Sequence, residues 1–417
     1  MGRGNRPRVV VTGMGAITPL GLNVQDTWQA LIEGRSGIGR ITQFDASAYP
    51  TQITGEVKGF DPGEYMDVKE ARRMARFSQF AVAGAKMAME DAGLTVDESN
   101  ADDVGVVMGT AVGGGLRESQ EAHLILLNKG VRRVSPLFVP SMIPNAAAHH
   151  VASAFGVRGY SSTVIGACAS GNQAIGEGTR AIRDGTAPVV ITGGTESAMC
   201  ELALAGIGAM RALSTRNDEP ERASRPFDAE RDGFVSAEGC GILVLEDLEY
   251  ALARGAQIQA ELLGYGVTSD AYHVSAPDPE GRGSALAMRR AIEDAGLRTE
   301  DIEYINAHAT ATPIGDPAEV AAIKRVMGDR AYEIPVNATK SMIGHLMGAS
   351  GAVETIAMIM EINEGILHPT INWETPDPDC DLDCVPNVAR EAKVDIALKN
   401  SFGFGGQNAC LVLGRYA

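Results

Sequence analysis

The chain has 417 residues, of which 45% are hydrophobic and 21% charged, a composition typical of a packed globular protein with roughly two or three core-forming units. Its 53 Asp and Glu residues outnumber its 36 Lys and Arg residues, so the formal net charge is −17. A surface this acidic excludes nucleic acid as a general partner.

Cysteine spacing and hydropathy narrow the class of protein further. The six Cys residues are irregularly spaced and predict no disulfide framework, and Cys380 and Cys384 lack the second ligand pair of a zinc site. Residues 1–13 contain no long apolar stretch, so no signal peptide is predicted. The uncharged stretches 134–157 and 159–176 contain Pro, His, Ser and Gly residues that argue against membrane spans, and we expect them to be deeply buried. We therefore expect a cytoplasmic protein that contacts neither metal nor membrane.

The first predicted strand begins at Val9 and runs into Gly13-Met14-Gly15, as the first strand of a dinucleotide-binding fold does. However, Thr18 stands where the third Gly of that fingerprint belongs, and no acidic residue ends a second strand at the required distance. The two glycines therefore indicate a tight strand exit and not a nucleotide site.

The chain repeats itself once. The pentapeptide Glu-Asp-Ala-Gly-Leu occurs at 90–94 and again at 293–297. Each copy ends an Ala- and Met-rich helical stretch, with Gly where a helix C-terminus favours it, and is followed by an acidic loop and a strand. The helical stretches are 80–91 and 284–294, and the strands are 104–108 and 302–306.

A second matched pair of elements supports the repeat. Ala-Ser-Gly at 169–171 and again at 349–351 opens a helix with one apolar face. A strand follows each helix, at 188–192 and at 396–398.

The two halves therefore have the same order of strands and helices. This order predicts an α/β fold with two pseudo-symmetric sheets and helices packed between and around them. We place the junction near residue 255, which divides the chain into halves 1–255 and 256–417 within one body.

Cys168 is the first candidate catalytic residue. An apolar strand leads into it and a helix leads out, so its thiol is predicted to lie over the N-terminus of that helix. The helix dipole and free N–H groups there favour a thiolate, which predicts a pKa lowered from ~8.5. The alternative is a buried structural cysteine.

His308 and His345 both follow predicted strands of the second half, at the strand ends where α/β folds place their chemistry. Each alone is more often structural, but together with Cys168 they predict a Cys-His-His centre across the pseudo-twofold axis. Neither has metal-ligand spacing to another His, so no metal is predicted. The Gly-rich turn at 400–408 could add backbone N–H groups to an oxyanion hole with the N–H of Cys168, or it is only a tight turn.

Seven segments carry a resemblance to a known family. They are VTGMGAITPLG at 11–21, TVIGACASGN at 163–172, RALSTRNDEPERASRPFDAERDGFV at 211–235, TSDAYH at 268–273, NAHATATPIGD at 306–316, TKSMIGH at 339–345 and NSFGFGG at 400–406. With them the chain resembles, over nearly its whole length, the β-ketoacyl-acyl carrier protein synthases of the elongating type, and synthase II most of all. The resemblance implies a thiolase-like α/β fold, a layered α-β-α-β-α body that is usually a homodimer.

The same resemblance implies an activity and the residues that perform it. Malonyl-acyl carrier protein would condense, with loss of CO2, with an acyl group held on Cys168, giving 3-oxoacyl-acyl carrier protein in fatty-acid elongation. His308 and His345 would stabilise the enolate, and Lys340 would support them electrostatically. The implied substrate-binding residues are Phe404 (a gating aromatic with its N–H in the oxyanion hole), Thr310 and Thr312 (phosphopantetheine arm), Val112 (limit of the acyl pocket) and Phe234. No cofactor is implied, because the phosphopantetheine arm arrives on the acyl carrier protein.

Two features go beyond this pattern. Ala309 and Ala311 replace the Gly and Ser that the family usually has after its first active-site His, which could narrow the pantetheine channel or shift substrate choice. A basic helical face, with a second basic pair, could steer the acidic acyl carrier protein, or it is simply a solvated face. The basic residues are Lys69, Arg72, Arg73 and Arg76 on that face, and Arg132 and Arg133 in the pair.

Three other functions stay open at this point. The first is a polyketide or specialised-lipid ketosynthase with the same chemistry, which the sequence alone does not separate from fatty-acid elongation. The second is a non-catalytic partner subunit that shapes a pocket, although such partners lack the nucleophile present here as Cys168. The third is a cysteine hydrolase, which explains neither the second His nor the repeat.

Overall fold

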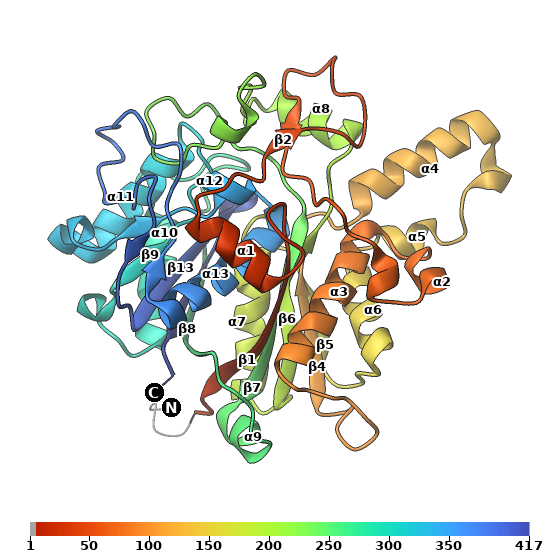
Figure 1. Ribbon diagram of the computed structural model, residues 1–417, viewed down its shortest axis with the longest axis horizontal. Coiled ribbons are helices and arrows are strands. Elements are labelled where there is room, and N and C mark those ends of the chain that lie inside the picture. Colours follow the sequence, from red (N-terminus) through yellow and green to blue (C-terminus); the bar gives the residue numbers. More distant parts are fainter. Residues whose placement is uncertain (1–5, 417) are drawn as a thin grey trace.

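The computed structural model describes residues 6–416 (Figure 1). Residues 1–5, part of the segment for which no signal peptide is predicted, lie outside the described residues. In the described chain, one 10-stranded sheet has the order β10-β9-β13-β14-β8-β1-β7-β6-β4-β5. The strands of the first half are β1 (Val9–Ile17), β4 (Val104–Gly109), β5 (Ser161–Val164), β6 (Val189–Glu196) and β7 (Gly239–Asp247). Those of the second half are β8 (Ala260–Ser269), β9 (Tyr304–Asn306), β10 (Val336–Asn337), β13 (Ile396–Gly403) and β14 (Gln407–Gly414).

The strand order confirms the predicted duplication. The first half runs β1-β7-β6-β4-β5 and the second runs β8-β14-β13-β9-β10. In each half the first three strands are antiparallel and the last three parallel. The expectation of two separate sheets is wrong in one respect. Residues 9–11 of β1 hydrogen-bond with residues 260–262 of β8, which joins the two half-sheets along this seam.

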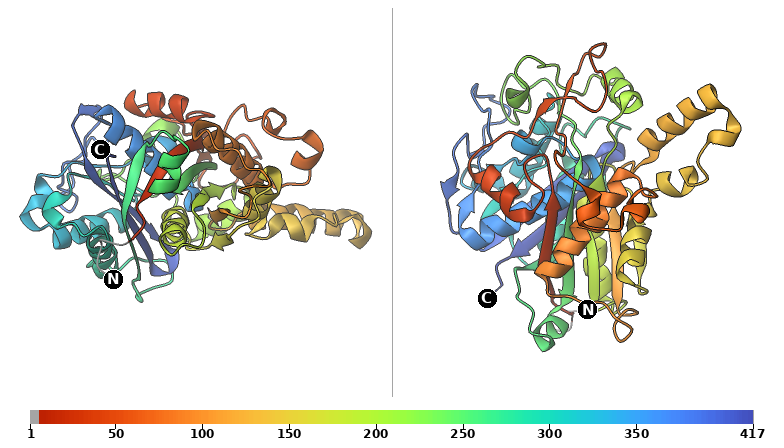
Figure 2. Two further views of the ribbon diagram at one scale, coloured as in Figure 1. Left: turned by 90° about the horizontal axis from the view of Figure 1, so that it is seen from below. Right: turned by 45° about the vertical axis from the view of Figure 1, so that its right-hand side comes forward.

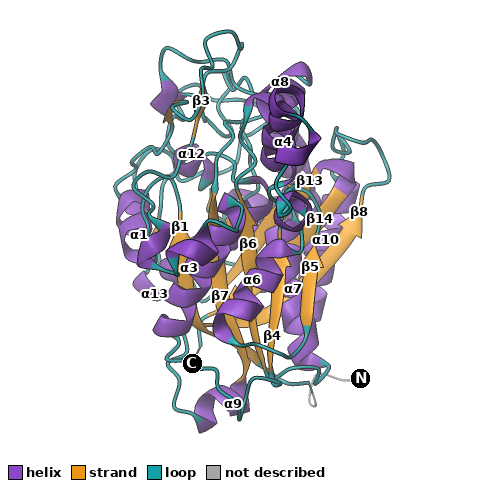
Figure 3. Cartoon of the chain, turned by 90° about the vertical axis from the view of Figure 1, so that its right-hand side faces the viewer, coloured by secondary structure: helices purple, strands orange, loops and turns teal. Residues whose placement is uncertain are grey.

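Helices cover both outer faces and fill the space between the half-sheets, as expected for a thiolase-like fold. Helices α3 (Arg76–Asp91) and α6 (Ala146–Phe155) lie over the first half-sheet (Figure 3). Helices α10 (Arg282–Asp294) and α11 (Gly315–Met327) belong to the opposite outer layer. Between the half-sheets lie α7 (Ser170–Arg183) and α13 (Ser350–Glu364). The remaining helices and strands are α1 (Val24–Ile32), α2 (Val68–Ala71), α4 (Gly115–Lys129), α5 (Phe138–Met142), α8 (Glu201–Ala209), α9 (Leu248–Ala253), α12 (Lys340–Ile343), β2 (Gly39–Arg40), β3 (Ile53–Thr54), β11 (Ile366–Leu367) and β12 (Arg390–Glu391).

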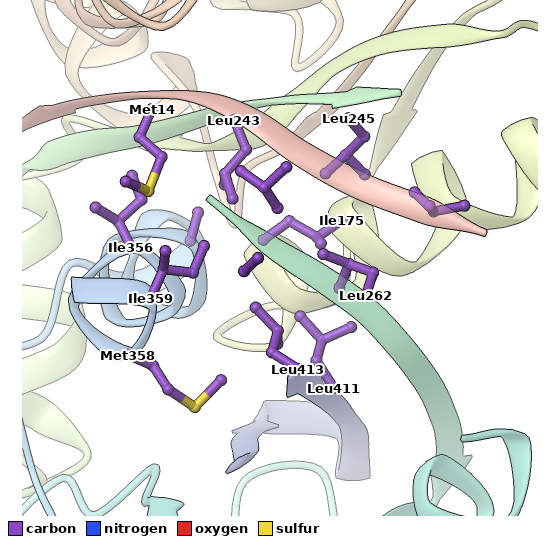
Figure 4. Close-up of a cluster of buried hydrophobic side chains, with 14 of the residues drawn as sticks. Met14, Ile175, Leu243, Leu245, Leu262, Ile356, Met358, Ile359, Leu411 and Leu413 are labelled. Atoms are coloured by element: carbon purple, nitrogen blue, oxygen red, sulfur yellow. The ribbon is translucent and has the colours of Figure 1, made fainter. Parts of the chain in front are cut away.

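The central core joins the two halves into one body. Ile175 of α7 and Ile356 and Ile359 of α13 pack together with side chains from both half-sheets (Figure 4). The sheet residues in this cluster include Leu243, Leu245, Leu262, Leu411 and Leu413. Because each half buries its inner face against helices of both, neither half has an apolar core of its own on this side. The junction near residue 255 itself stays a prediction.

The Gly-x-Gly at the start of the chain serves helix packing. A Cβ at Gly13 would lie 2.1 Å from the carbonyl oxygen of Ala88 in α3. In the second half, a Cβ at Gly264 would lie 2.1 Å from the carbonyl oxygen of Ala291 in α10. The same close approach of a helix to a strand therefore occurs in both halves, and it explains the glycines without a nucleotide.

The expectation that residues 134–157 and 159–176 are deeply buried is wrong for much of the first stretch and for the start of the second. Residues 134–145 are mostly exposed, and Ile165 is 58% exposed. Helix α4 and the segment after it project from the body (Figures 1 and 2). Leu137 and Val139 within the first stretch are 40% and 58% exposed, and Leu127 and Val131 just before it are 68% and 75% exposed. Apolar residues without charge are as compatible with an interface as with a core, so composition alone did not separate the two. Among the described residues, no helix is long and apolar enough to cross a membrane.

The predicted basic face is split between separate elements. Lys69 lies in α2, and Arg72 and Arg73 follow that helix, all three exposed. Arg76 begins α3 and points into the body, where its Nη2 donates to Glu238 Oε1 at 2.9 Å and its guanidinium lies 4.6 Å from the Phe80 ring centroid. Arg76 therefore packs inside the protein and does not belong to the exposed basic face. Arg132 and Arg133 are exposed, as predicted.

The close approach of α3 to β1 generates a stability prediction. Gly13→Ala is expected to lower the free energy of unfolding by about 3 kcal/mol or more, because the new methyl group overlaps a backbone carbonyl that cannot move alone. Gly206→Ala is the matched control, because its Cβ would meet nothing within 4 Å in α8 and an alanine favours a helix by up to ~1 kcal/mol. Denaturant unfolding of both variants checks this. Equal stability of the two would show that the strand and helix are not in close contact.

Candidate active site

A cavity of about 630 Å³ opens between the two halves and gathers the predicted site residues. Both halves contribute to its wall. Cys168, Val112 and Phe234 come from the first half, and the second half contributes His308, Thr310, Thr312, His345 and Phe404. Among the sequence-predicted site residues, Lys340 alone does not line the cavity and lies behind the histidines.

Cys168 lies in a tight turn between β5 and α7. Ala167 before it has φ +49°, a left-handed conformation that costs a non-Gly residue roughly 1–2 kcal/mol. The Ser170 hydroxyl stabilises this turn, since it accepts from Gly166 N at 2.9 Å and lies 2.7 Å from the carbonyl oxygen of Ala167. The backbone N–H groups of Phe404 and of Cys168 itself approach the sulfur and favour its thiolate form. These two donors come from opposite halves of the chain, and an oxyanion hole built from them stays a prediction.

The predicted low pKa of Cys168 is wrong. Burial raises the pKa of this thiol to about 12, against the opposing effects of Lys340 and the N–H of Phe404. The side chain is only 7% exposed, and loss of hydration disfavours the charged form more than the nearby donors favour it. Cys168 is therefore a neutral thiol at pH 7.

His308 and His345 face each other beside this thiol. Their ring centroids are 5.4 Å apart with an interplanar angle of 83°. Ser350 Oγ lies 2.9 Å from His345 Nδ1, and the Phe234 ring meets His345 edge-on with centroids 5.4 Å apart. Burial, and secondly the charge of Lys340, hold the pKa of each imidazole well below its usual range. Both histidines are thus neutral at pH 7.

The loop after His308 is fixed by a carboxylate of α11. Glu319 Oε1 accepts from His308 N at 2.9 Å, and Glu319 Oε2 accepts from Ala309 N at 2.7 Å. Ala309 and Ala311 have φ values of +24° and +65°, a region that glycine tolerates best. Ala309 lines the cavity. Thr310 and Thr312 lie together, with their hydroxyl oxygens 3.2 Å apart.

The sequence patterns did not predict two buried charged residues near the histidines, Glu354 and Lys399. Lys340 Nζ donates to Glu354 Oε1 at 2.5 Å, and Lys399 Nζ lies 2.7 Å from Glu354 Oε2. All three side chains are at most 1% exposed. The available signal was a single charge inside an apolar stretch, as in the run around Glu354 and in the strand before Asn400.

Val112, just before α4, also lines the cavity, and α4 contacts α8. Leu116, Ile207 and Met210 line the cavity too. Within residues 6–416, no cluster of His, Cys, Asp and Glu side chains is arranged to hold a metal ion. The arrangement offers a thiol, two neutral imidazoles and two backbone donors around one apolar space.

The raised pKa of Cys168 predicts slow alkylation with a steep pH dependence. The thiolate fraction of a group with a pKa of about 12 rises about tenfold per pH unit between pH 7 and 9, so the rate of modification by iodoacetamide should rise likewise. Intact-mass measurement follows the reaction, and Cys168→Ala corrects for the other cysteines. A rate that levels off below pH 8 would show that the thiol is activated without substrate.

Comparison with known proteins agrees with this geometry. Residues 6–251 match the family model "Beta-ketoacyl synthase, N-terminal domain" and residues 259–374 match "Beta-ketoacyl synthase, C-terminal domain". A 3-oxoacyl-[acyl-carrier-protein] synthase 2 from Synechocystis sp. is 52% identical over 411 residues, 99% of each chain.

Two solved structures are similar over 99% of this chain and 100% of theirs. The ishigamide ketosynthase/chain length factor has a TM-score of 0.93 at 40% identity. A type II PKS acyl-carrier protein in complex with its ketosynthase bound to the hexaketide gives a TM-score of 0.90 at 34% identity. The chain belongs to the β-ketoacyl synthase family.

Proposed function

We propose that this chain catalyses the decarboxylative Claisen condensation of malonyl-acyl carrier protein with an acyl group carried on Cys168. The products are 3-oxoacyl-acyl carrier protein and CO2, and the reaction elongates a fatty-acid chain. One observation supports this above all: a buried cysteine and two neutral histidines share one apolar cavity with two converging backbone N–H donors.

The first half-reaction transfers the acyl group to Cys168. The thioester carbonyl oxygen would lie against the N–H groups of Cys168 and Phe404, which stabilise the negative charge of the tetrahedral intermediate. As the sulfur attacks, its proton passes to a neutral imidazole and then to the departing phosphopantetheine thiol. This transfer explains how a thiol with a raised pKa can act as a nucleophile.

The second half-reaction forms the new carbon–carbon bond. The malonyl thioester loses CO2, and the resulting enolate oxygen accepts hydrogen bonds from His308 and His345. Neutral imidazole N–H groups suit this role because they stabilise the enolate without protonating it fully. The carbanion then attacks the acyl-Cys168 carbonyl, again in the oxyanion hole, and Cys168 is released. The division of work between the two histidines stays open.

Charged groups and the cavity mouth would complete the site. Lys340 would hold both histidines neutral, since its charge lowers the pKa of each. Thr310 and Thr312 would bind the phosphopantetheine arm, with Phe404, 40% exposed, as the gating aromatic beside the sulfur. No step needs a metal or a cofactor of the enzyme's own, because the arm arrives on the carrier protein.

The proposed macromolecular partners are an acyl carrier protein and a second copy of this chain. Exposed basic residues near α2, Lys69 and Arg72, would attract an acidic carrier protein. The apolar side chains that α4 exposes support the homodimer, because a surface of this kind is usually covered in solution. Since Leu116 of α4 also lines the cavity, a second copy bound at α4 would close the cavity on this side. A cytoplasmic location stays a prediction from the sequence.

A second candidate is a polyketide or specialised-lipid ketosynthase, favoured by the similarity to the two ketosynthase structures described above. It uses the same residues and the same chemistry and differs only in the acyl chain. A non-catalytic pocket-shaping subunit is disfavoured, since such partners lack the nucleophile.

Acylation of Cys168 is the direct test of the proposed function. The protein is incubated with a medium-chain acyl-acyl carrier protein and its intact mass is measured. We expect a gain of one acyl group, and no gain for Cys168→Ala, which leaves the cavity intact but removes the nucleophile. Folded protein that gains no mass with any of several chain lengths would refute the condensing activity, and acylation by polyketide intermediates alone would favour the second candidate.

Val112 is proposed to limit the length of the acyl chain. Val112→Phe fills part of the cavity beside Leu116. The preferred acyl chain should therefore become shorter, and the rate with long chains should fall at least tenfold. Val388→Phe makes the same exchange at a site that is 73% exposed and outside the cavity, and its chain-length profile should equal the wild type. An unchanged profile for Val112→Phe would remove this residue as the limit.

A further inference from the structure

The buried carboxylate of Glu354 forms ion pairs with two ammonium groups. Its Oε1 is 2.5 Å from Lys340 Nζ and its Oε2 is 2.7 Å from Lys399 Nζ. Such an arrangement is unusual, because each buried charge must be compensated by its surroundings. Lys340 belongs to the predicted site, whereas Lys399 has no role in the mechanism described so far.

Several buried carboxylates lie near Lys399 and the two histidines. On the side of His308, the carboxylate of Glu319 accepts from three donors, the N–H groups of His308 and Ala309 and the Asn400 side chain. Lys340 and Lys399 therefore balance two carboxylates, Glu354 and Glu319. Beyond Cys168 lies Glu196, whose pKa is raised to about 7 by burial and which accepts from Ala111 N. Beside Glu319 lies Asp316, whose pKa burial raises to about 6 and which is near the charge of Arg231. Without Lys399, Lys340 alone would balance Glu354 and Glu319.

The position of Lys399 is fixed by its strand. Lys399 lies in β13, opposite Leu411 of β14, and its ammonium group also donates to the carbonyl oxygen of Asn400. The side chain is fully buried and does not line the cavity. Any effect of Lys399 on the reaction must therefore act through the histidines and not by contact with substrate.

We propose that Lys399 is a positioning residue of the condensation reaction: as the second cation on Glu354, it balances the buried carboxylates and so keeps His308 and His345 as neutral donors. This inference rests on the proposed function and extends it by one residue. The charge of Lys399 acts on both imidazoles in the same direction as that of Lys340, lowering the pKa of each. It also opposes the build-up of negative charge that the thiolate and the enolate would otherwise meet.

The sign of the effect gives a test. Removing a cation raises the pKa of the two histidines, so they become protonated at a higher pH and lose their function as the pH falls through that value. The acidic limb of the pH–rate profile should then move up by about one pH unit. Lys399→Gln is the variant of choice, because its amide can still donate to the Asn400 carbonyl, and Lys399→Arg retains the charge and should retain the wild-type limb.

The experiment measures the rate of malonyl-acyl carrier protein decarboxylation from pH 5 to 8 for all variants, with circular dichroism to verify folding. Lys393→Gln removes the same charge from a side chain that is 80% exposed and should leave the profile unchanged. A Lys399→Gln enzyme that is slower at every pH, with its acidic limb in the wild-type place, would overturn the proposal and leave Lys399 a structural residue. If Lys399→Gln does not fold, a shift of the limb in Lys399→Arg by as much as one unit would overturn it instead. A wild-type enzyme that neither acylates Cys168 nor decarboxylates malonyl-acyl carrier protein would refute the proposed function, a result distinct from either.

Discussion

The close crossing of α7 and α13 at their N-termini is the contact on which the site depends. A Cβ at Gly171 of α7 would lie 2.8 Å from Ala352 N, and a Cβ at Gly351 of α13 would lie 2.9 Å from Asn172 N. The two helices can therefore meet only because each begins with Ser-Gly. Cys168 stands just before one helix and His345 just before the other. The two copies of the repeat thus bring Cys168 and His345 to one cavity because they touch at this point.

Burial at this crossing determines the protonation state of each reacting group. Loss of hydration raises the pKa of Cys168 and lowers those of His308 and His345, so all three groups are neutral at pH 7. The charged side chains Lys340, Lys399 and Glu354 lie behind these groups and do not line the cavity. This separation lets negative charge form in the cavity near fixed cations without a permanent ion pair that would trap the nucleophile.

The sequence predicted the duplication and the gathering of the site, because both depend on local patterns. The repeated pentapeptide and the Ala-Ser-Gly helix starts are contiguous in the chain, and the strand order follows from them. What it did not predict depends on three-dimensional surroundings. The pKa of Cys168 is determined by burial, the pairing of Lys399 with Glu354 joins residues 45 positions apart, and the exposure of the segment around Val139 depends on what α4 lies against. Each of these needs the packed structure.

The two alanines after His308 show how neighbouring carboxylates stabilise a strained backbone. Each adopts a positive φ, which costs a residue with a Cβ roughly 1–2 kcal/mol. Both backbone N–H groups donate to buried carboxylates of α11, Ala309 to Glu319 and Ala311 to Asp316 at 3.1 Å. A hydrogen bond to a charged group contributes about 1.5–3 kcal/mol, so these two bonds are sufficient to offset the strain. Helix α11 therefore fixes the backbone of the His308 loop with Ala309 and Ala311 in a positive-φ conformation.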